Sequence, residues 1–463
     1  MTDTARHTPN SRPPGPKGHP IYGGLSRYHH DPIAFLEDNA ATYGDVSAFR
    51  FLHLPVWQLH HPDDVRRVLV DPDGAFTKGV AMEGFRPLVG KGLLLAEGED
   101  HRRQRRLMAP AFHRAALAGY AEEMVSAARR EAASWTDGQT VDMDVQMNRL
   151  ALGVAARTLF GASLSDAEVQ DVAEAVSGFV QWYHQSTDPL GPLLQRLPTR
   201  ATRTFKAGKR RLSTVIARIV AERRQNPGPD ILSRLLNARD SEGDRATLSP
   251  EHLHDEAVTL LIAGHETTGA TLAWAWHLMA QHPAIGDRLA AEVRAVVGEA
   301  PPESQDLPKL AYARWIFAEA LRLYPTAIAL PRQAQKSVVL GGYTAPKGTL
   351  LMVATWCTHR DPRWWERPLE FWPERWDPAL SSDRPKFAYF PFGGGARMCI
   401  GEEFAWTEGT LVLATLGQRW RARGVPGREV RPEALFTVRP RGGLPMVVEA
   451  RRRVRQVSRI STQ

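Results

Sequence analysis

Residues 390–401 read Phe-Pro-Phe-Gly-Gly-Gly-Ala-Arg-Met-Cys-Ile-Gly, and they place one cysteine, Cys399, in a glycine-rich loop. Glycine lets a backbone adopt conformations closed to other residues and approach its neighbours closely. A helical pattern begins at Glu402, so Cys399 lies near a predicted helix N-terminus, where the helix dipole favours a thiolate. Arg397 adds a cation that could support the thiolate or bind an anionic group. Such a cysteine is suited to bind a soft metal ion.

The spacing Phe-Gly-x-Gly-x-Arg-x-Cys-x-Gly over residues 392–401 resembles the haem-binding signature of the cytochrome P450 monooxygenases. In that family the cysteine is the axial ligand of the haem iron. The resemblance therefore implies haem b (iron protoporphyrin IX) with its iron ligated by Cys399, and it places Arg397 among the cofactor-binding residues. From the residues alone, two other interpretations stay open, a buried structural thiol and a nucleophile paired with one of the 16 histidines.

Composition and length indicate one large globular unit. The chain has 463 residues, 43% hydrophobic and 24% charged, and no Gly/Ser linker divides it. We expect a proline-rich flexible segment at 1–19, a single domain at 20–450 and a basic tail at 451–463. The first 20 residues have no apolar run, so we expect neither a signal peptide nor a membrane anchor. With only two cysteines, far apart in the sequence, no disulfide framework is needed and the cytoplasm fits.

A net charge of +8 is compatible with nucleic acid, an anionic membrane or an acidic protein partner, and no nucleic-acid motif supports the first. The segment 99–112 predicts a helix with four arginines. His101 and Arg105 stand at i and i+4, on one helical face, and the resemblance implies that they hold the haem propionates. The remaining arginines would form a basic surface for a redox partner or a plain solvated face. These arginines are Arg102, Arg103 and Arg106.

A second motif lies in a predicted helix that begins with Ser249 as N-cap and Pro250 at its first position and runs to about Gln281. Glu266 and Thr267 interrupt its apolar middle, and burying such polar groups costs free energy unless they are hydrogen-bonded. A threonine that bonds back to a helix carbonyl would explain them structurally. The resemblance implies a catalytic pair that relays protons to dioxygen.

Glu319 and Arg322 stand at i and i+3 on another predicted helix, a spacing that usually means a surface salt bridge. The resemblance implies a buried network of this pair with Arg375, with the structural role of supporting the cysteine loop. It also implies that Arg332 binds a propionate. Cys357 follows an apolar strand, and we interpret it as structural.

The remaining pattern predicts strands at 46–51 and 56–60, a helix at 63–70 and several helices between 115 and 240. Aromatic residues at helical spacing could line a substrate site or belong to the core; they are Phe179, Trp182 and Tyr183. The predicted fold class is mainly α with a smaller β-rich subregion. The resemblance implies the cytochrome P450 fold, with haem between the long central helix and the helix after the cysteine loop.

The function implied is a haem-thiolate monooxygenase that inserts one oxygen atom from O2 into an apolar small molecule, by hydroxylation or epoxidation. No flavin, nicotinamide or iron–sulfur motif is found in the sequence, so NAD(P)H electrons would arrive through a separate ferredoxin or flavodoxin with its reductase. An arginine-rich composition suggests secondary metabolism with a terpenoid or polyketide substrate. The alternatives are a peroxygenase or isomerase, a non-catalytic haem sensor, and a cysteine hydrolase without haem.

Overall fold

The computed structural model describes the chain apart from residues 1–11, 187–190, 192–196, 239–247, 381–382 and 452–463. Most of the expected basic tail and the first part of the proline-rich segment therefore lie outside the described residues. Pro14 is described, and its carbonyl accepts a 2.8 Å hydrogen bond from the Ala48 amide. A Cβ on Gly15 would lie 2.0 Å from the Ala48 carbonyl oxygen. This part of the segment that we expected to be flexible thus packs along a strand.

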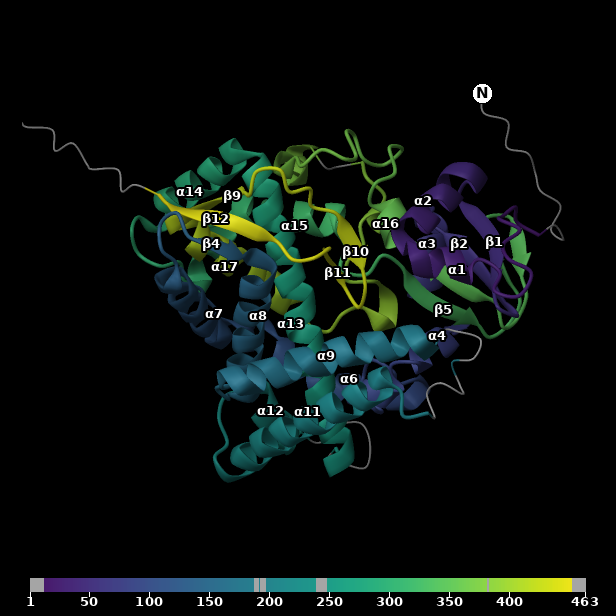
Figure 1. Ribbon diagram of the computed structural model, residues 1–463, viewed down its shortest axis with the longest axis horizontal. Coiled ribbons are helices and arrows are strands. Elements are labelled where there is room, and N and C mark those ends of the chain that lie inside the picture. The colour runs from purple at the N-terminus through teal and green to yellow at the C-terminus, as the bar shows by residue number, and fades with distance from the viewer. Residues whose placement is uncertain (1–11, 187–190, 192–196, 239–247, 381–382, 452–463) are drawn as a thin grey trace, which may run out of the picture.

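The fold is mainly helical (Figure 1). The longer helices are α7 (Arg114–Ser134), α8 (Met143–Phe160), α9 (Asp166–Ser186), α11 (Arg200–Gln225), α13 (Pro250–Gln281), α14 (Pro283–Val297) and α17 (Glu402–Arg419). The shorter helices are α1 (Leu25–His30), α2 (Pro32–Tyr43), α3 (Pro62–Val70), α4 (Val80–Glu83), α5 (Arg86–Val89), α6 (Gly98–Met108), α12 (Ile231–Asn237), α15 (Ala311–Leu323) and α16 (Thr355–Thr358).

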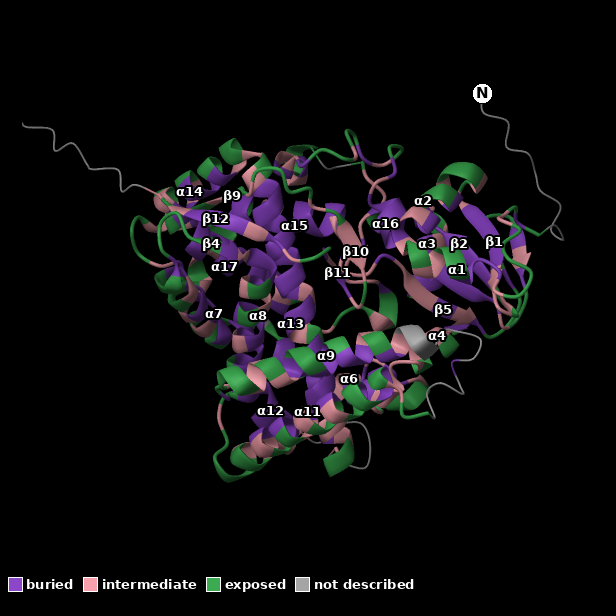
Figure 2. Ribbon diagram, viewed as in Figure 1, coloured by how far each residue is buried: buried purple, intermediate pink, exposed green. Residues whose placement is uncertain are grey.

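Helix α13 is the central element. The Ser249 hydroxyl accepts a 3.2 Å hydrogen bond from the His252 amide, and Pro250 occupies the first helical position, as predicted. The helix extends over 32 residues and is buried along most of its length (Figure 2). Close approach of α8 depends on Gly269, because a Cβ there would lie 2.8 Å from the Asn148 Cα. This contact places the start of α8 beside the middle of α13.

A five-stranded sheet forms the β-rich region on the right of Figure 1. Its order is β1 (Val46–Phe51), β2 (Leu54–Leu59), β8 (Leu350–Val353), β5 (Leu330–Ala334) and β3 (Phe76–Thr77). Only the β2–β8 pair is parallel in this sheet. Strand β2 begins two residues earlier than predicted, since Leu52, at φ 52°, forms the hairpin turn and Pro55 pairs with Arg50.

Three small sheets complete the described fold. They are β4 (Thr140–Asp142) with β12 (Pro445–Ala450) and β9 (Trp420–Gly424), β6 (Val338–Leu340) with β7 (Tyr343–Ala345), and β10 (Pro432–Ala434) with β11 (Val438–Pro440). The β10–β11 hairpin lies beside α13 near the centre of the molecule (Figure 1), and the Trp274 indole donates a 2.9 Å hydrogen bond to the Val438 carbonyl. Within the described ranges, no helix has the length and apolar character needed to cross a membrane.

Candidate functional site

The cysteine loop lies directly on helix α3. Gly395 has φ +66°, and a Cβ there would approach the Leu69 carbonyl oxygen to 2.3 Å. Glycine is required at this position both for its conformation and for the close approach. The Cys399 amide donates a 2.9 Å hydrogen bond to the Phe392 carbonyl, which closes the loop on itself. Helix α17 follows with Gly401 as its N-cap residue, so Cys399 stands two residues before the cap, as the sequence predicts.

The electrostatics of the Cys399 thiol differ from the sequence-based expectation. The residue is exposed, yet the protein atoms around the sulfur raise the pKa of the thiol above its ordinary value. Burial is the largest cause; a hydrogen bond from the Gly401 amide lowers this pKa, Glu402 raises it and Arg105 lowers it. Arg105, and not Arg397 as we expected, is the cation that acts on the sulfur. Arg397 instead points its guanidinium at the Ala96 carbonyl, 2.9 Å away, and at the Glu97 carboxylate.

Glu319, Arg322 and Arg375 meet in one buried network. The Arg322 guanidinium donates two hydrogen bonds to the Glu319 carboxylate, at 2.7 and 2.9 Å. Arg375 donates a third to the same carboxylate at 2.8 Å, and all three residues are at most 2% exposed. The Trp376 indole adds a fourth at 2.9 Å. Such a charge-assisted cluster costs much less in the interior than separated charges would, because each ionised group has its partners.

His359 connects this network to the cysteine loop, and the sequence reasoning missed it. Its carbonyl accepts a 2.9 Å hydrogen bond from Arg322, and its Nε2 accepts a 3.0 Å hydrogen bond from the Phe390 amide at the start of the loop. The ring is fully buried, and burial lowers the pKa of His359 well below its usual value, so it is neutral and able to accept. The available signal was the polar run 359–361 directly after an apolar strand and a short helix.

The predicted cofactor-binding residues His101, Arg105, Arg332 and Arg397 come from three separate segments; Arg105 and Arg332 act electrostatically on His101, and Arg397 and Arg332 act on the nearby Lys78. Arg105 on α6 donates a 2.7 Å hydrogen bond to the Met398 carbonyl, next to the cysteine. Burial, followed by repulsion from Lys78, Arg105, Arg102 and Arg332, lowers the pKa of His101 to about 4. His101 is therefore neutral near pH 7, with N–H donation as its available role.

Lys78 belongs to the same group, although nothing in the sequence singled it out. Burial, then repulsion from Arg397 and Arg332, lowers its pKa to about 7. Burial also lowers the pKa of Arg332 to about 10. We call Lys78, His101, Arg105, Arg332 and Arg397 the "basic cluster"; Arg105 reaches the Met398 carbonyl beside Cys399, and Glu256, Asp71 and Glu97 offset part of the cluster's charge. A dianionic group such as the two propionates of haem b fits this donor set, and a thiolate fits its iron.

In the middle of α13, small residues that are partly accessible alternate with buried ones. Ala263 is exposed and Thr267 is half-buried, while Glu266 is only 4% exposed. The Thr267 hydroxyl donates a 2.8 Å hydrogen bond back to the Ala263 carbonyl. The Glu266 carboxylate accepts a 3.0 Å hydrogen bond from the Thr437 hydroxyl, on the β10–β11 hairpin. The acid and the alcohol are adjacent in sequence, but their hydrogen bonds go to different partners.

Comparison with known proteins decides the family. A family model described as "Cytochrome P450" matches residues 13–443. The chain belongs to the cytochrome P450 family. This P450 is 37% identical to cyclooctatin synthase of Streptomyces melanosporofaciens over 96% of this chain and 97% of that protein. It is 35% identical to cyclooctat-9-en-7-ol 5-monooxygenase of the same organism, over 97% and 99% of the two chains.

Two further matches agree. Pentalenene oxygenase of Streptomyces avermitilis is 35% identical, over 90% of this chain and 93% of its own. The crystal structure of the cytochrome P450DA haem domain superimposes with a TM-score of 0.86 at 27% identity, covering 96% of this chain and 98% of that one. The predicted fold class and enzyme class are thereby confirmed: this protein is a haem-thiolate monooxygenase that uses O2 and redox partners, with haem b held through a cysteine thiolate.

The surface arginines of this P450 are less free than the sequence suggested. Arg102 is exposed and pairs with Glu99 at 2.7 Å, and Arg106 reaches the same carboxylate at 3.6 Å. Arg103 and Arg106 are half-buried. Of the three, Arg102 is the most exposed, with 66% of its side chain accessible, and it too is paired with a carboxylate.

The aromatic residues of α9 divide between two roles. Phe179 and Trp182 are buried, and Trp182 stacks on Phe205 with ring centroids 4.9 Å apart, so both belong to the core. Tyr183 is partly buried, and its ring lies 5.1 Å from that of Phe85. Phe85 in turn lies 5.7 Å from Phe436 of the β10–β11 hairpin. Of the three predicted residues, Tyr183 alone contacts this outer aromatic group without being fully buried.

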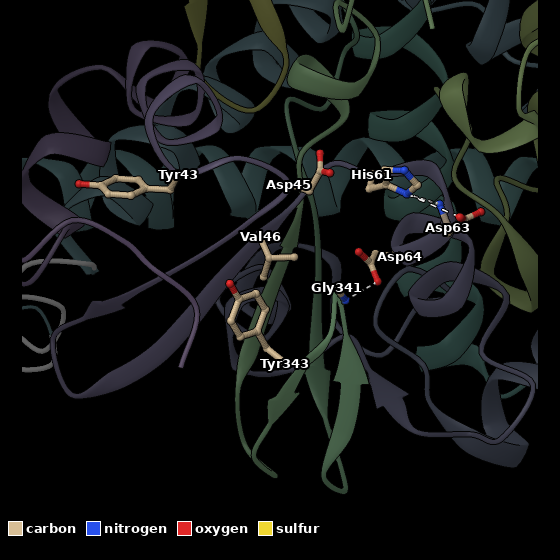
Figure 3. A pocket seen from close by; sticks show the side chains of 8 residues that line it. All are labelled: Tyr43, Asp45, Val46, His61, Asp63, Asp64, Gly341 and Tyr343. Carbon is tan, nitrogen blue, oxygen red and sulfur yellow. Dashed lines mark hydrogen bonds and ion pairs between the residues drawn. The ribbon is translucent and has the colours of Figure 1, made fainter. Parts of the chain in front are cut away.

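A surface pocket of about 470 Å³ lies at the other end of α3, away from the cysteine loop (Figure 3). Its lining is acidic, with Asp45, Asp63 and Asp64, and Asp64 accepts a 2.8 Å hydrogen bond from the Gly341 amide. Asp45 also pairs with Arg363. The same guanidinium also pairs with Asp361 at 2.6 Å, so one arginine offsets two carboxylates.

Proposed function

We propose that this P450 oxygenates an apolar cyclic compound of the terpenoid class, by hydroxylation or epoxidation. The observation that carries the proposal is the full-length similarity to proteins named for cyclooctat-9-en-7-ol and pentalenene. The outer aromatic group of Phe85, Tyr183 and Phe436 supports it, since such rings offer a large apolar contact area.

In this proposal Cys399 is the iron ligand, because the sulfur of the other cysteine, Cys357, is buried and donates to the Leu36 carbonyl at 3.4 Å. The basic cluster holds the propionates through charge-assisted hydrogen bonds. The bound haem supplies oxygen activation, in which the thiolate pushes electron density onto iron and favours O–O cleavage. The network of Glu319, Arg322 and Arg375 supports the loop that carries the sulfur.

Glu266 and Thr267 have the proton-transfer role. The Thr267 hydroxyl is half-buried at the small-residue face of α13 and carries one hydrogen, now donated to Ala263. The Glu266 carboxylate is buried next to it in the sequence, and a positioned carboxyl group is one of the side chains that can take part in such a proton transfer. Because adjacent residues of a helix do not face each other, Glu266 would have to rotate away from Thr437 to approach Thr267.

Electrons would come from a ferredoxin or flavodoxin with its reductase. An acidic partner would dock on the face of α6 that carries Arg102, and attraction between exposed charges weakens as salt shortens the Debye length from about 10 Å at 0.1 M to about 3 Å at 1 M. The reduction rate should therefore fall with ionic strength, and less steeply in Arg102→Glu. We also propose a cytoplasmic location, which suits two free thiols.

A binding screen followed by turnover tests the function. The haem-loaded protein is titrated with cyclic terpene hydrocarbons and alcohols and with polyketide lactones, and the spin-state change of the Soret band identifies ligands. Hits are then incubated with NAD(P)H, a ferredoxin and its reductase under labelled O2. Incorporation of one labelled oxygen atom into a terpene supports the proposal, whereas lactone-only turnover overturns the substrate class. Full activity with peroxide alone, without NAD(P)H, would establish the peroxygenase alternative.

A further inference from the structure

The β10–β11 hairpin contacts Glu266 with two of its residues. Thr437 donates to one carboxylate oxygen at 3.0 Å, and an Arg439 Nη atom lies 3.6 Å from the other. Side chains alternate along a strand, so Thr437 and Arg439 share one face and Val438 takes the opposite one. Val438 is 1% exposed and belongs to a different hydrophobic cluster, with Trp274. Thr437, just before β11, and Arg439, within it, therefore both face Glu266.

Arg439 is shared by two carboxylates. Its second Nη atom lies 3.4 Å from Asp144, on α8. Both separations exceed the 2.7–2.9 Å typical of a tight charge-assisted hydrogen bond. The two acids lie at different depths, because the side chain of Glu266 is 5% exposed, that of Asp144 is 11% exposed and that of Arg439 is 28% exposed. One partly exposed cation thus stands between an inner acid and an outer acid.

The charged surroundings of both acids are limited. Asp144 has a pKa raised above its usual value, chiefly by burial, and Arg439 lowers it while Asp142 and Glu266 raise it. Glu266 acts electrostatically on its neighbour His265, whose pKa burial lowers. The Nδ1 atom of that ring is bonded to the Leu261 carbonyl at 2.8 Å, so His265 is not a mobile partner for Glu266.

We infer that Thr437 and Arg439 are positioning residues that orient the Glu266 carboxylate, and that Asp144 competes with Glu266 for the Arg439 guanidinium. When Asp144 is protonated, Arg439 is drawn to Glu266 alone and holds it against the hairpin. When Asp144 is ionised, Arg439 is divided, and Glu266 is released to turn toward Thr267. This inference rests on the proposed role of Glu266, and it adds a control on when that acid is available.

The first test needs no turnover. Infrared difference spectra of the ferric, haem-loaded protein follow protonation of the Asp144 carboxyl, which Asp144→Asn identifies. Arg439→Gln should raise the pKa of Asp144, because a cation is lost, whereas Glu266→Gln should lower it, because a like charge is lost. Arg439→Lys should restore most of the wild-type titration. Damage to packing alone would not produce shifts of opposite sign.

The second test uses coupling, measured as product and peroxide per NAD(P)H. In the wild type, product per NAD(P)H should rise with pH through the titration of Asp144. Asp144→Asn should remove this step and leave coupling at its low-pH value, at least twofold below the wild-type maximum. The matched control is Arg441→Gln, on the same hairpin, 59% exposed and paired with Glu433, which should keep the step.

The outcomes separate the two proposals. An Asp144 titration that neither Arg439→Gln nor Glu266→Gln moves, or moves in the same direction, overturns the inference while leaving oxygenation intact. The other outcome is that the Asp144 pKa shifts in opposite directions in Arg439→Gln and Glu266→Gln, while product per NAD(P)H is unchanged in Glu266→Gln. That result supports the positioning of Glu266 and overturns its role in proton transfer.

Discussion

The Glu319 carboxylate and the Arg322 guanidinium, three residues apart on α15, form a two-pronged ion pair whose side chains are both 0% exposed. Removing one partner would leave the other charge buried. For Glu319→Gln we expect a loss of roughly 3–5 kcal/mol of stability and poor haem retention, since the cost of an uncompensated buried charge is large. Haem content per chain and the urea midpoint are the measurements. Glu83→Gln, which breaks an exposed i,i+3 pair with Arg86, is the control and should change stability by about 1 kcal/mol or less. Equal effects of the two substitutions would contradict a supporting role for the network.

The two cysteines permit a matched comparison. Cys399→Ser should give a folded or partly folded protein without the red-shifted Soret band of the reduced carbon monoxide complex and without oxygenase activity, because a neutral hydroxyl cannot replace a thiolate ligand. Cys357→Ser should keep that band, since its sulfur lies buried against Leu36. Absorption spectra of both purified variants decide the matter. A thiolate-type band in Cys399→Ser would refute the ligand assignment.

Thr267 and Thr271 make the same kind of hydrogen bond, each to the carbonyl four residues earlier, at 2.8 and 2.9 Å. Thr271 is 1% exposed, whereas Thr267 is half-buried. Thr267→Ala should retain haem and NAD(P)H consumption. The rate of product formation should fall on the order of a hundredfold, and the peroxide released should rise. Thr271→Ala should remain coupled. Peroxide and product per NAD(P)H are measured for both, and identical behaviour of the two would mean that this hydroxyl only stabilises the helix.

Gly395 has a φ of +66°, and a Cβ added there would clash with the Leu69 carbonyl oxygen. Gly298 has a φ of +63°, and no neighbouring atom lies within 4 Å of the place that its Cβ would take. Gly298 has ψ −125°, outside the left-handed helical region, so Gly298→Ala measures a conformational penalty of about 1–3 kcal/mol without a steric contact. Gly395→Ala should cost a further 1–3 kcal/mol or so, because the cysteine loop must move off Leu69. Thermal unfolding gives both values, and the Soret band shows whether the loop shift reaches Cys399. Similar losses for the two variants would exclude a tight contact with α3.

Burial raises the pKa of Glu256 from 4.5 to about 7, opposed by a hydrogen bond from the Leu93 amide. The folded protein therefore holds a proton that the unfolded chain releases, so this residue's contribution to stability is intact below pH 4.5 and is lost as pH rises toward 7 and beyond. The loss is at most about 3 kcal/mol. Urea midpoints between pH 4.5 and 8 should fall less steeply in Glu256→Gln than in the wild type. Glu251→Gln, an exposed acid on the same helix, should leave the wild-type slope unchanged.

The features predictable from sequence were those encoded within a few residues. The Ser249 cap, the i,i+3 spacing of Glu319 and Arg322, and the glycines around Cys399 are local patterns with local causes. The family resemblance supplied the roles assigned to them. Arg375 was placed only through that resemblance, because its ion pair spans 56 residues of sequence.

The features that were missed join distant segments. Lys78 follows a two-residue strand and looks like any solvated lysine, yet the fold buries it beside Arg332 and Arg397. Thr437 reaches Glu266 across 171 residues. The expected influence of Arg397 on the sulfur was wrong because Glu97, three hundred positions earlier, attracts that guanidinium. Partners so far apart in the sequence cannot be predicted from local residue spacing.

Binding of the cofactor would bring the negative charge of its two propionates to the basic cluster. A porphyrin that arrives with two free carboxylates adds negative charge to a group on which only three acids act, Glu256 on Lys78, Asp71 on Arg332 and Glu97 on Arg397. Its diester has nearly the same shape and apolar area but leaves the mutual repulsion in place. We therefore expect the protein without cofactor to bind the dicarboxylic porphyrin more tightly than its diester. Salt screens the same charges, so the difference in affinity between the dicarboxylic porphyrin and its diester should shrink at high ionic strength.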